Sequence, residues 1–174
     1  IFSSSCIVFC AGLDLSAFDI VLANIPKEIS PFNARFGEAL YRSAKELQEY
    51  ISKLEKIRVP VIAAIHGGCI GGAVDLVTAC DIRLATTDAF FCIQEINIGM
   101  AADVGTLQRL PRIIPDSKMR ELAYTGRRML ADEAKESGLV SDVYNSQEEM
   151  LSAAKEMANE IAKKSPIAIY GLKD

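Results

Sequence analysis

The sequence predicts an α/β fold, and three observations lead to this prediction. Short apolar runs of strand length alternate along the chain with segments of helical periodicity. The continuous apolar run at residues 61–65 is typical of a strand that is buried on both faces. A glycine-rich turn at residues 66–73 then leads directly into a helical segment, an order that aims backbone N–H groups at a ligand.

Length and composition limit the classes of protein that the chain can belong to. Its 174 residues correspond to about one domain, and its 50% apolar content is ordinary for a globular chain. Every long apolar stretch is interrupted by charge, so no membrane span is predicted. The net charge of −4 offers no basic surface for nucleic acid. Five cysteines without a C-x-x-C pair indicate free thiols in a reducing compartment, with no disulfide framework and no metal site.

The first half of the chain is expected to contain two strands and two helices. Residues 5–10 are predicted to form a short buried strand, followed by a brief helical stretch toward Ala23 and a loop with Pro26 and Pro31. Residues 36–57 predict an amphipathic helix, because apolar residues recur there every three or four positions. The apolar stripe, which we expect to face the core, consists of Leu40, Ala44, Leu47, Ile51 and Leu54. The second strand is the run at residues 61–65.

The second half continues the alternation of strands and helices. After a helix at residues 74–80, two short strands are predicted at 82–85 and 90–93, then a turn around Asn97 and Gly99. Helices resume from about Val104, with a short one at 131–137 and a small strand at 139–143. Ser146 and Glu149 form a candidate capping box for a helix that continues to about Lys163.

Three acidic residues are candidates for proton transfer because each lies in apolar or glycine-rich sequence: Asp75, Glu95 and Asp103. Burial disfavours the charged form of a carboxylic acid, and acids that lie close together raise one another's pKa. Such a cluster can exchange protons near neutral pH. The alternative for any single acid is a helix cap, a turn residue or a buried partner of Arg83 or Arg109. The presence of all three acids beside a glycine turn favours a role in proton transfer over these structural roles.

The glycine turn itself does not match the nucleotide-binding patterns. It lacks G-x-x-x-x-G-K-[ST], and it lacks G-x-G-x-x-G followed by a ribose-binding acid. Glycines do allow a substrate to approach free N–H groups at the start of a helix, where developing negative charge is stabilised. An oxyanion hole is therefore the predicted use of this turn.

These residues resemble the crotonase, or enoyl-CoA hydratase/isomerase, superfamily. The similarity runs in order from about residue 5 to residue 168 and is carried by residues 9–15, 60–67, 71–76, 79–83 and 105–111. Within the superfamily the chain is most similar to the dienoyl-CoA isomerases, above all through residues 99–105, GMAADVG. Related hydratases carry two acids spaced as Asp75 and Glu95 are here, with a glycine at the position of Asp103.

The resemblance implies a fold, a reaction and a set of site residues. The implied fold is a ClpP-like spiral of ββα units, in a single domain over residues 1–174 that we expect to be a fragment truncated at both ends. The implied reaction is the shift of two conjugated double bonds in fatty-acid β-oxidation, by proton transfer from C2 to C6 of a dienoyl-CoA. Glu95 and Asp103 would exchange the two protons, with Asp75 as a third, supporting acid. The alternatives are an enoyl-CoA hydratase of the same fold, or an acyl-CoA-binding subunit without catalysis.

The resemblance also implies the binding residues and the surroundings of the protein. The backbone N–H groups of Leu13 and Gly72 would form the oxyanion hole. The coenzyme A part of the substrate would lie along Ala11, Gly12, Leu13, Asp14, Leu15 and Gly71. No metal or redox cofactor is implied, and the partner is the acyl-CoA substrate. The resemblance further implies a homotrimer or homohexamer in the mitochondrial matrix or the peroxisome.

Other conspicuous residues are expected to have structural roles. His66, the only histidine, matches a strand-end position that the superfamily does not use for proton transfer. Cys69 and Cys92 flank the predicted site, but no histidine stands in a dyad-like relation to them, so small buried side chains are expected there. Arg127 and Arg128 are expected to be a solvated basic pair.

Overall fold

The strands of the protein form two small sheets. The computed structural model describes residues 1–14, 16 and 34–173, so the predicted short helix toward Ala23 and the loop with Pro26 and Pro31 lie outside the described residues. The first sheet is parallel, in the order β1 (Ile62–Ile65), β3 (Ile82–Thr86), β6 (Asp142–Tyr144). In the second sheet β2 (Gly68–Ile70) pairs in parallel with β4 (Phe90–Cys92), and β4 pairs antiparallel with β5 (Met129–Leu130).

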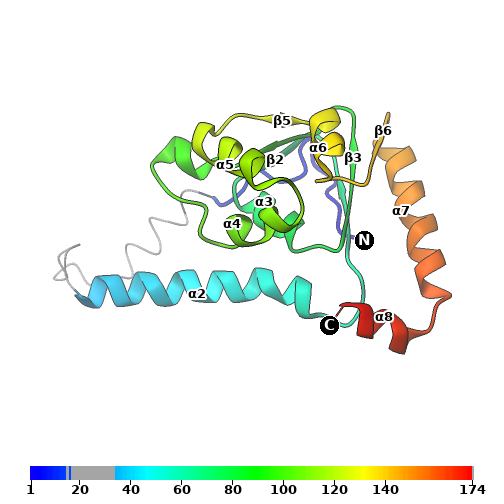
Figure 1. The fold of residues 1–174 in the computed structure, drawn as a ribbon, viewed down its shortest axis with the longest axis horizontal. Helices are drawn as coiled ribbons and strands as arrows, with labels where there is room; N and C mark the ends of the chain where they lie inside the picture. Colours follow the sequence, from blue (N-terminus) through cyan, green and yellow to red (C-terminus); the bar gives the residue numbers. More distant parts are fainter. Residues whose placement is uncertain (15, 17–33, 174) are drawn as a thin grey trace.

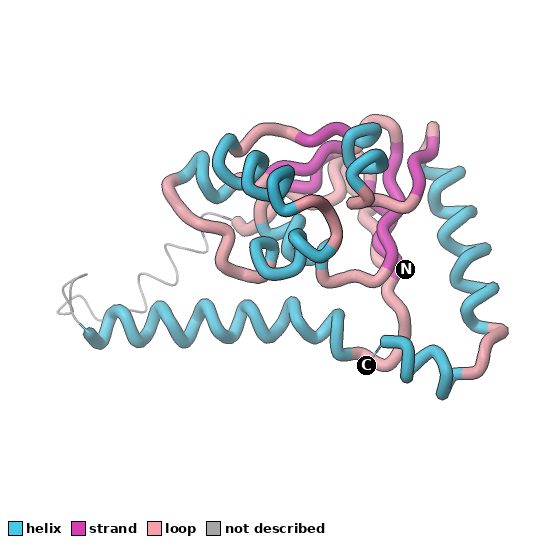
Figure 2. Tube along the Cα trace, viewed as in Figure 1, coloured by secondary structure: helices cyan, strands magenta, loops and turns pink. Residues whose placement is uncertain are grey.

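The first four strands alternate between the two sheets. Figures 1 and 2 show the strands gathered at the centre of the molecule. β1 enters the first sheet and β2 the second, then α3 (Gly72–Thr78) follows, and β3 and β4 repeat the pattern. The in-register pairing of Ile62 with Ile82 and of Gly68 with Phe90 stacks one turn on the next. The predicted α/β fold and spiral of ββα units are confirmed.

Helices and turns surround the two sheets. The long α2 (Ala34–Lys56) runs along one side of the molecule, and α7 (Gln147–Ala162) stands on the other side of the first sheet (Figure 1). Ser146 accepts a hydrogen bond from the Glu149 N–H, which confirms the predicted cap of α7. The remaining elements are η1 (Glu95–Ile98), α4 (Thr106–Arg109), η2 (Leu110–Arg112), α5 (Asp116–Thr125), α6 (Ala131–Ser137) and α8 (Pro166–Lys173).

The two faces of β1 belong to two separate hydrophobic clusters. Ile62 and Ala64 pack toward α7, against Met150 and Ala154. The alternate residues Ala63 and Ile65 belong to the larger cluster, which also contains α3 and the strands of the second sheet. All four residues of β1 are buried, as predicted for a strand covered on both faces.

The predicted strand at residues 5–10 is wrong. Residues 5–9 form bends, and the segment pairs only at two single positions, Phe2 with Ala63 and Cys10 with Cys69. The Ser4 hydroxyl donates to the Val8 carbonyl and accepts from the Cys6 N–H, so side-chain hydrogen bonds replace a regular ladder. Ile7 is consequently 95% exposed.

Two short strands lie where the sequence predicted none, and one is shifted. β2 lies inside the predicted glycine turn, because two of its three residues, Cys69 and Ile70, continue the apolar pattern and pair with β4. β5 has only two residues, too few for a periodic signal. The last strand occupies Asp142–Tyr144 rather than 139–143, because Leu139 and Val140 fill the larger core instead of pairing.

The helix predicted at 36–57 is present, but its apolar stripe does not face a core. Leu40 and Leu47 are 45% and 42% exposed, and of the stripe only Leu54 packs against the larger cluster. Periodicity shows which side chains share a helix face but not what covers that face. Polar side chains of α2 that lie beside this stripe, Gln48, Ser52 and Glu55, also bond to the described body of the protein.

Candidate active site

Asp75 lies on α3, immediately after the glycine turn, and is completely buried. Its Oδ1 accepts a hydrogen bond of 2.6 Å from the backbone N–H of Thr106 at the start of α4. Its Oδ2 is buried without a hydrogen-bond partner among the described residues. Burial raises the pKa of Asp75, against the Thr106 hydrogen bonding and the charge of Arg109, and the charge of Asp103 raises it further.

Glu95 is the first residue of η1 and lies against the glycine turn. A Cβ atom added at Gly71 would lie in van der Waals contact with Glu95 Oε1, at 3.4 Å, and the backbone φ of +56° there favours glycine. Oε2 is buried and has no partner within the described residues. Burial raises the pKa of Glu95, its own N–H lowers it, and the charges of Asp75 and Asp103 raise it again.

Asp103 lies in the loop before α4, and its side chain is exposed. Its charge acts on both other acids, because it contributes to the raised pKa of Asp75 and of Glu95. Among the described residues none of the three acids takes part in an ion pair. The three carboxylic acids that the sequence singled out therefore influence one another electrostatically, and burial raises the pKa of Asp75 and of Glu95.

The two predicted oxyanion donors, Leu13 and Gly72, lie next to each other. A Cβ atom added at Gly72 would be 3.9 Å from the Leu13 nitrogen. Gly12, at φ +91°, brings its backbone against the turn, and a Cβ there would be 2.7 Å from the Ile70 carbonyl oxygen and 3.5 Å from the Gly72 nitrogen. Gly72 begins α3, where an N–H has no partner within the helix. The backbones of Leu13 and Gly72 thus lie side by side at the glycine turn.

The remaining predicted binding residues line the approach to this point. Gly71 caps α3 at φ +56° and donates its N–H to the Cys92 carbonyl at 2.9 Å, which fixes the turn to β4. Ala11 is exposed and Leu13 is 49% exposed. The hydroxyl and N–H of Ser16 both donate to Asp14 Oδ1, and they lower the pKa of Asp14. Leu15 lies outside the described residues.

Arg83 and Arg109, which the sequence offered as partners of the acids, have other contacts. Arg83 donates to the carbonyls of Leu139, Cys80 and Val77. Arg109 pairs with Glu55 at 2.9 Å and donates to Ser52 at 2.8 Å. An ion pair with a single arginine is therefore not what holds any of the three acids in the described part of the chain.

The other residues that the sequence noted have structural contacts. His66 is buried, and its Nε2 lies 2.7 Å from the Cys6 carbonyl oxygen. Cys69 and Cys92 are buried free thiols. Arg127 forms ion pairs with Glu121 and Glu133, contrary to the expected solvated pair, and Arg128 lies over the Phe90 ring. The side chains of His66, Arg127 and Arg128 each contact a neighbour that the linear sequence did not indicate.

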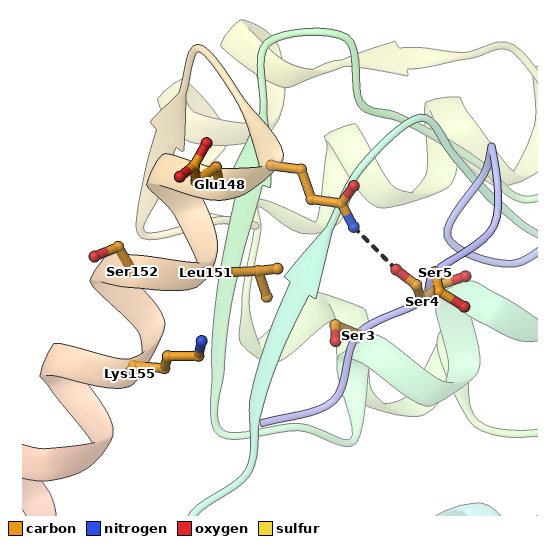
Figure 3. A pocket seen from close by; sticks show the side chains of 8 residues that line it. Ser3, Ser4, Ser5, Glu148, Leu151, Ser152 and Lys155 are labelled. Carbon is orange, nitrogen blue, oxygen red and sulfur yellow. Dashed lines mark hydrogen bonds between the residues drawn. The ribbon is translucent and has the colours of Figure 1, made fainter.

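A separate hollow of about 830 Å³ lies on the other side of the first sheet. Figure 3 shows it between the N-terminal segment and α7, with the Gln147 amide donating to the Ser4 carbonyl. Its lining consists of Ser3, Ser4, Ser5, Gln147, Glu148, Leu151, Ser152 and Lys155. Asp75, Glu95 and Asp103 are not among the residues that line this hollow. The volume of a hollow therefore does not by itself identify the active site.

Sequence reasoning missed the residues that hold the acids in place. Thr106 acts through its backbone N–H, which any residue type could supply. Gln48 of α2 donates to the Asp103 carbonyl at 2.6 Å across 55 positions of sequence. Nothing in the local pattern around either residue points to this contact.

The described part of the chain also bears on membrane spans and metal sites. Among the described residues there is no helix long and apolar enough to cross a bilayer. They also contain no group of three or more His, Cys, Asp or Glu side chains arranged to hold a metal ion.

The fold and the site together define a class of protein, one in which a glycine turn between a strand and a helix lies beside buried carboxylic acids. Comparison with known proteins identifies the class. The family model described as Enoyl-CoA hydratase/isomerase matches residues 1–174. The chain belongs to the enoyl-CoA hydratase/isomerase family, which has the crotonase fold.

Relatives and solved structures give the same picture in more detail. The chain is 50% identical over 167 residues to a mitochondrial Δ(3,5)-Δ(2,4)-dienoyl-CoA isomerase of Pongo abelii, covering 95% of this chain and 50% of that protein. It is 47% identical to a peroxisomal one of Arabidopsis thaliana, covering 95% and 59%. The crystal structure of an enoyl-CoA hydratase from Bacillus anthracis superposes with a TM-score of 0.82 at 34% identity, covering 98% and 61%. The chain thus spans about half the length of the curated relatives it matches.

Proposed function

We propose that the protein is a Δ3,5-Δ2,4-dienoyl-CoA isomerase. The observation that carries the proposal is the third acid: Asp103 lies near enough to Asp75 and Glu95 to raise the pKa of both. The relatives from Pongo abelii and Arabidopsis thaliana that carry this name are 50% and 47% identical to the chain. A reaction that removes one proton at C2 and returns one at C6, four carbons away, is best served by more than one acid–base group.

The proposed reaction is an internal proton transfer. A base removes the C2 proton of a 3,5-dienoyl-CoA, and the electron pair moves into the conjugated system and onto the thioester oxygen. The N–H groups of Leu13 and Gly72 would stabilise that oxygen as it gains negative charge. Return of a proton at C6 gives the 2,4-dienoyl-CoA. Atoms and electrons balance within the substrate, so the proposed reaction needs no metal or redox cofactor.

Glu95 and Asp103 are proposed to exchange the two protons. Glu95 has a buried, unpartnered oxygen beside the glycine turn, and Asp103 is exposed in the loop before α4. The Glu95 side chain as a whole is half-buried rather than enclosed, and that of Asp103 is exposed, so we propose that a substrate meets both acids at the edge of the glycine turn. Asp75 is fully buried and its Oδ1 is occupied by Thr106, so it is proposed to support the pair electrostatically.

The experiment is to give the full-length protein a 3,5-dienoyl-CoA and to follow the ultraviolet absorbance of the 2,4-dienoyl-CoA product. Asp103→Asn and Asp103→Gly are measured beside the parent, with Asp88→Asn as the control. Asp88 is an exposed acid in the turn between β3 and β4. General acid–base catalysis contributes about 10²–10⁴-fold, so both Asp103 variants should lose activity on that scale while the control keeps it.

The other outcomes select the alternatives. Hydration of a 2-enoyl-CoA by the parent and by Asp103→Gly, with no conversion of the dienoyl-CoA, would identify a hydratase that uses Asp75 and Glu95. Binding of acyl-CoA without either reaction would identify a non-catalytic acyl-CoA-binding subunit.

The cellular location and the assembly state are proposed on the same basis. Relatives are named as mitochondrial and as peroxisomal enzymes, so we propose one of these two compartments for this protein. The full-length protein is proposed to be a homotrimer or homohexamer with the acyl-CoA substrate as its only small-molecule partner. Light scattering of the purified protein tests the assembly state, and a monomer would contradict it.

A further inference from the structure

We propose that Gln48 of α2 is a positioning residue for Asp103. Its side-chain Nε2 donates a hydrogen bond of 2.6 Å to the main-chain carbonyl of Asp103. Gln48 is partly buried, whereas its neighbours Leu47 and Glu49 are exposed, so this side chain is turned toward the body of the protein. The proposal deepens the proposed function, on which it rests for the chemical role of Asp103.

A second contact holds the next residue of the same loop. Arg109 is buried, and its Nη1 donates to the carbonyl of Val104, which directly follows Asp103. The guanidinium group lies directly against Gly105, since a Cβ added there would come within 1.6 Å of Nη1. The backbone at Gly105 has φ +131°, which also favours glycine. Two consecutive carbonyls, those of Asp103 and Val104, are therefore both hydrogen-bonded from side chains.

The second contact is itself tied to α2. Arg109 Nη2 donates to Ser52 Oγ at 2.8 Å, and Arg109 Nε pairs with Glu55 at 2.9 Å. Gln48, Ser52 and Glu55 are spaced four and three residues apart, so they share one face of the helix. We call these three residues the polar face of α2. This polar face contacts the loop that carries Asp103 in two ways. Gln48 bonds directly to the Asp103 carbonyl, and Ser52 and Glu55 hold Arg109, which bonds to the Val104 carbonyl.

This arrangement explains how an exposed acid keeps a fixed position. The Asp103 side chain makes no hydrogen bond or ion pair with the described residues, so its own contacts do not hold it. Its backbone is held by α2 on one side, and Thr106 three residues later is held by Asp75 on the other. Loss of the Gln48 bond frees the carbonyl nearest to the carboxylate, and a small misplacement of a reacting group is costly for catalysis.

The test compares Gln48→Met with Glu49→Met in the full-length protein. Met, Gln and Glu have similar helix propensities, so the two variants perturb α2 alike, but only the first removes the contact with Asp103. The first measurement is hydrogen–deuterium exchange of the backbone amides in residues 99–108. We expect at least threefold faster exchange in Gln48→Met and parent-like exchange in Glu49→Met.

The second measurement separates positioning from general structural damage. With a 3,5-dienoyl-CoA, Gln48→Met should lower kcat by about tenfold, the scale of one hydrogen bond, while KM stays within twofold. Deuterium uptake from heavy water at C2 and C6 should fall unequally, because only one of these protons is handled by Asp103. Glu49→Met should match the parent in all three quantities.

The outcomes that overturn the proposal are distinct from failure of the proposed function. Parent-like amide exchange in Gln48→Met overturns it whatever the activity, and so does an equal fall in uptake at C2 and C6. If the parent itself does not convert the dienoyl-CoA, the proposed function fails. The amide exchange then still decides whether Gln48 holds the Asp103 loop.

Discussion

The backbone N–H of Thr106 donates to Asp75 Oδ1 at 2.6 Å, and this bond joins the helix after the glycine turn to the loop that carries Asp103. One carboxylate oxygen is thereby fixed, while the other is buried without a partner in the described residues. A buried polar atom without a hydrogen bond costs free energy. Asp75 is thus retained at a cost to stability, as is common for groups that serve chemistry.

The first prediction concerns the stability of Asp75→Asn. Burial raises the pKa of Asp75 in the folded protein. Its contribution to the free energy of unfolding is therefore fully present below the unfolded-state pKa and is lost as the pH rises through the folded-state pKa. Asparagine keeps an oxygen for Thr106 and carries no charge. At pH 7 the variant should be more stable, by about 1 kcal/mol or a Tm increase of about 2–4 °C.

Thermal unfolding at pH 7 and near pH 4 checks this sign. The gain in Tm should shrink as the pH falls, because aspartate then takes up its proton. Asp88→Asn, at an exposed position, should change Tm little at either pH. A Tm of Asp75→Asn below that of the parent at pH 7 would show that the charge is favourable where it lies.

The second prediction concerns the pH dependence of activity and Glu95. Burial and the neighbouring acids raise the pKa of Glu95 above its ordinary value of 4.5. If it acts as the base, kcat/KM on a 3,5-dienoyl-CoA must rise with pH through a midpoint above 4.5. Glu95→Gln should lower kcat by about 10²–10⁴-fold and remove that limb of the profile. Glu148→Gln, beside the hollow near α7, should leave the profile unchanged, and a matching loss there would place the chemistry at the hollow.

The third prediction concerns Gly12. A Cβ at this position would lie 2.7 Å from the Ile70 carbonyl oxygen, and the backbone has φ +91°. Gly12→Ala must therefore push the loop away and displace the Leu13 N–H from Gly72. Loss of one oxyanion donor typically lowers kcat by about 10²–10³-fold.

Gly99→Ala is the matched control, because its φ of +74° is also strained but nothing lies within 4 Å of the added Cβ. Steady-state kinetics should show the large loss in Gly12→Ala alone; equal losses would mean that backbone strain, not the oxyanion hole, is responsible.

The α/β class could be predicted from local patterns in the sequence, whereas the spiral of ββα units was implied by the family resemblance. A buried parallel strand is a continuous apolar run, as at β1, and a glycine at positive φ such as Gly71 stands out within its own segment. The strand at residues 5–10 failed because the Ser4 hydroxyl competes with the ladder, and a hydroxyl leaves no periodic signal.

The contacts that hold the site could not be predicted in this way. The Gln48 side chain meets the Asp103 carbonyl across 55 positions, and Thr106 contributes a backbone group. Neither contact depends on a residue pattern, and only the packing of α2 and α4 brings the partners together. The expected core-facing stripe of α2 shows the same limit, since Leu40 and Leu47 remain exposed while polar neighbours make the contacts.

The fourth prediction concerns Lys173, which secures α8. Its side chain is 7% exposed, and its Nζ donates to the carbonyls of Leu54 and Val59 and to Asp81 Oδ2. Lys173→Met should lower the free energy of unfolding by about 1–3 kcal/mol, because three acceptors lose a charged donor. Lys163→Met removes an exposed pair with Glu160, in which the side chains are 67% and 62% exposed, and should cost less than about 0.5 kcal/mol. Urea unfolding of both variants measures the difference. Equal midpoints would mean that α8 contributes nothing to the cooperative unit, and the buried lysine would then be a local contact of a helix that opens on its own.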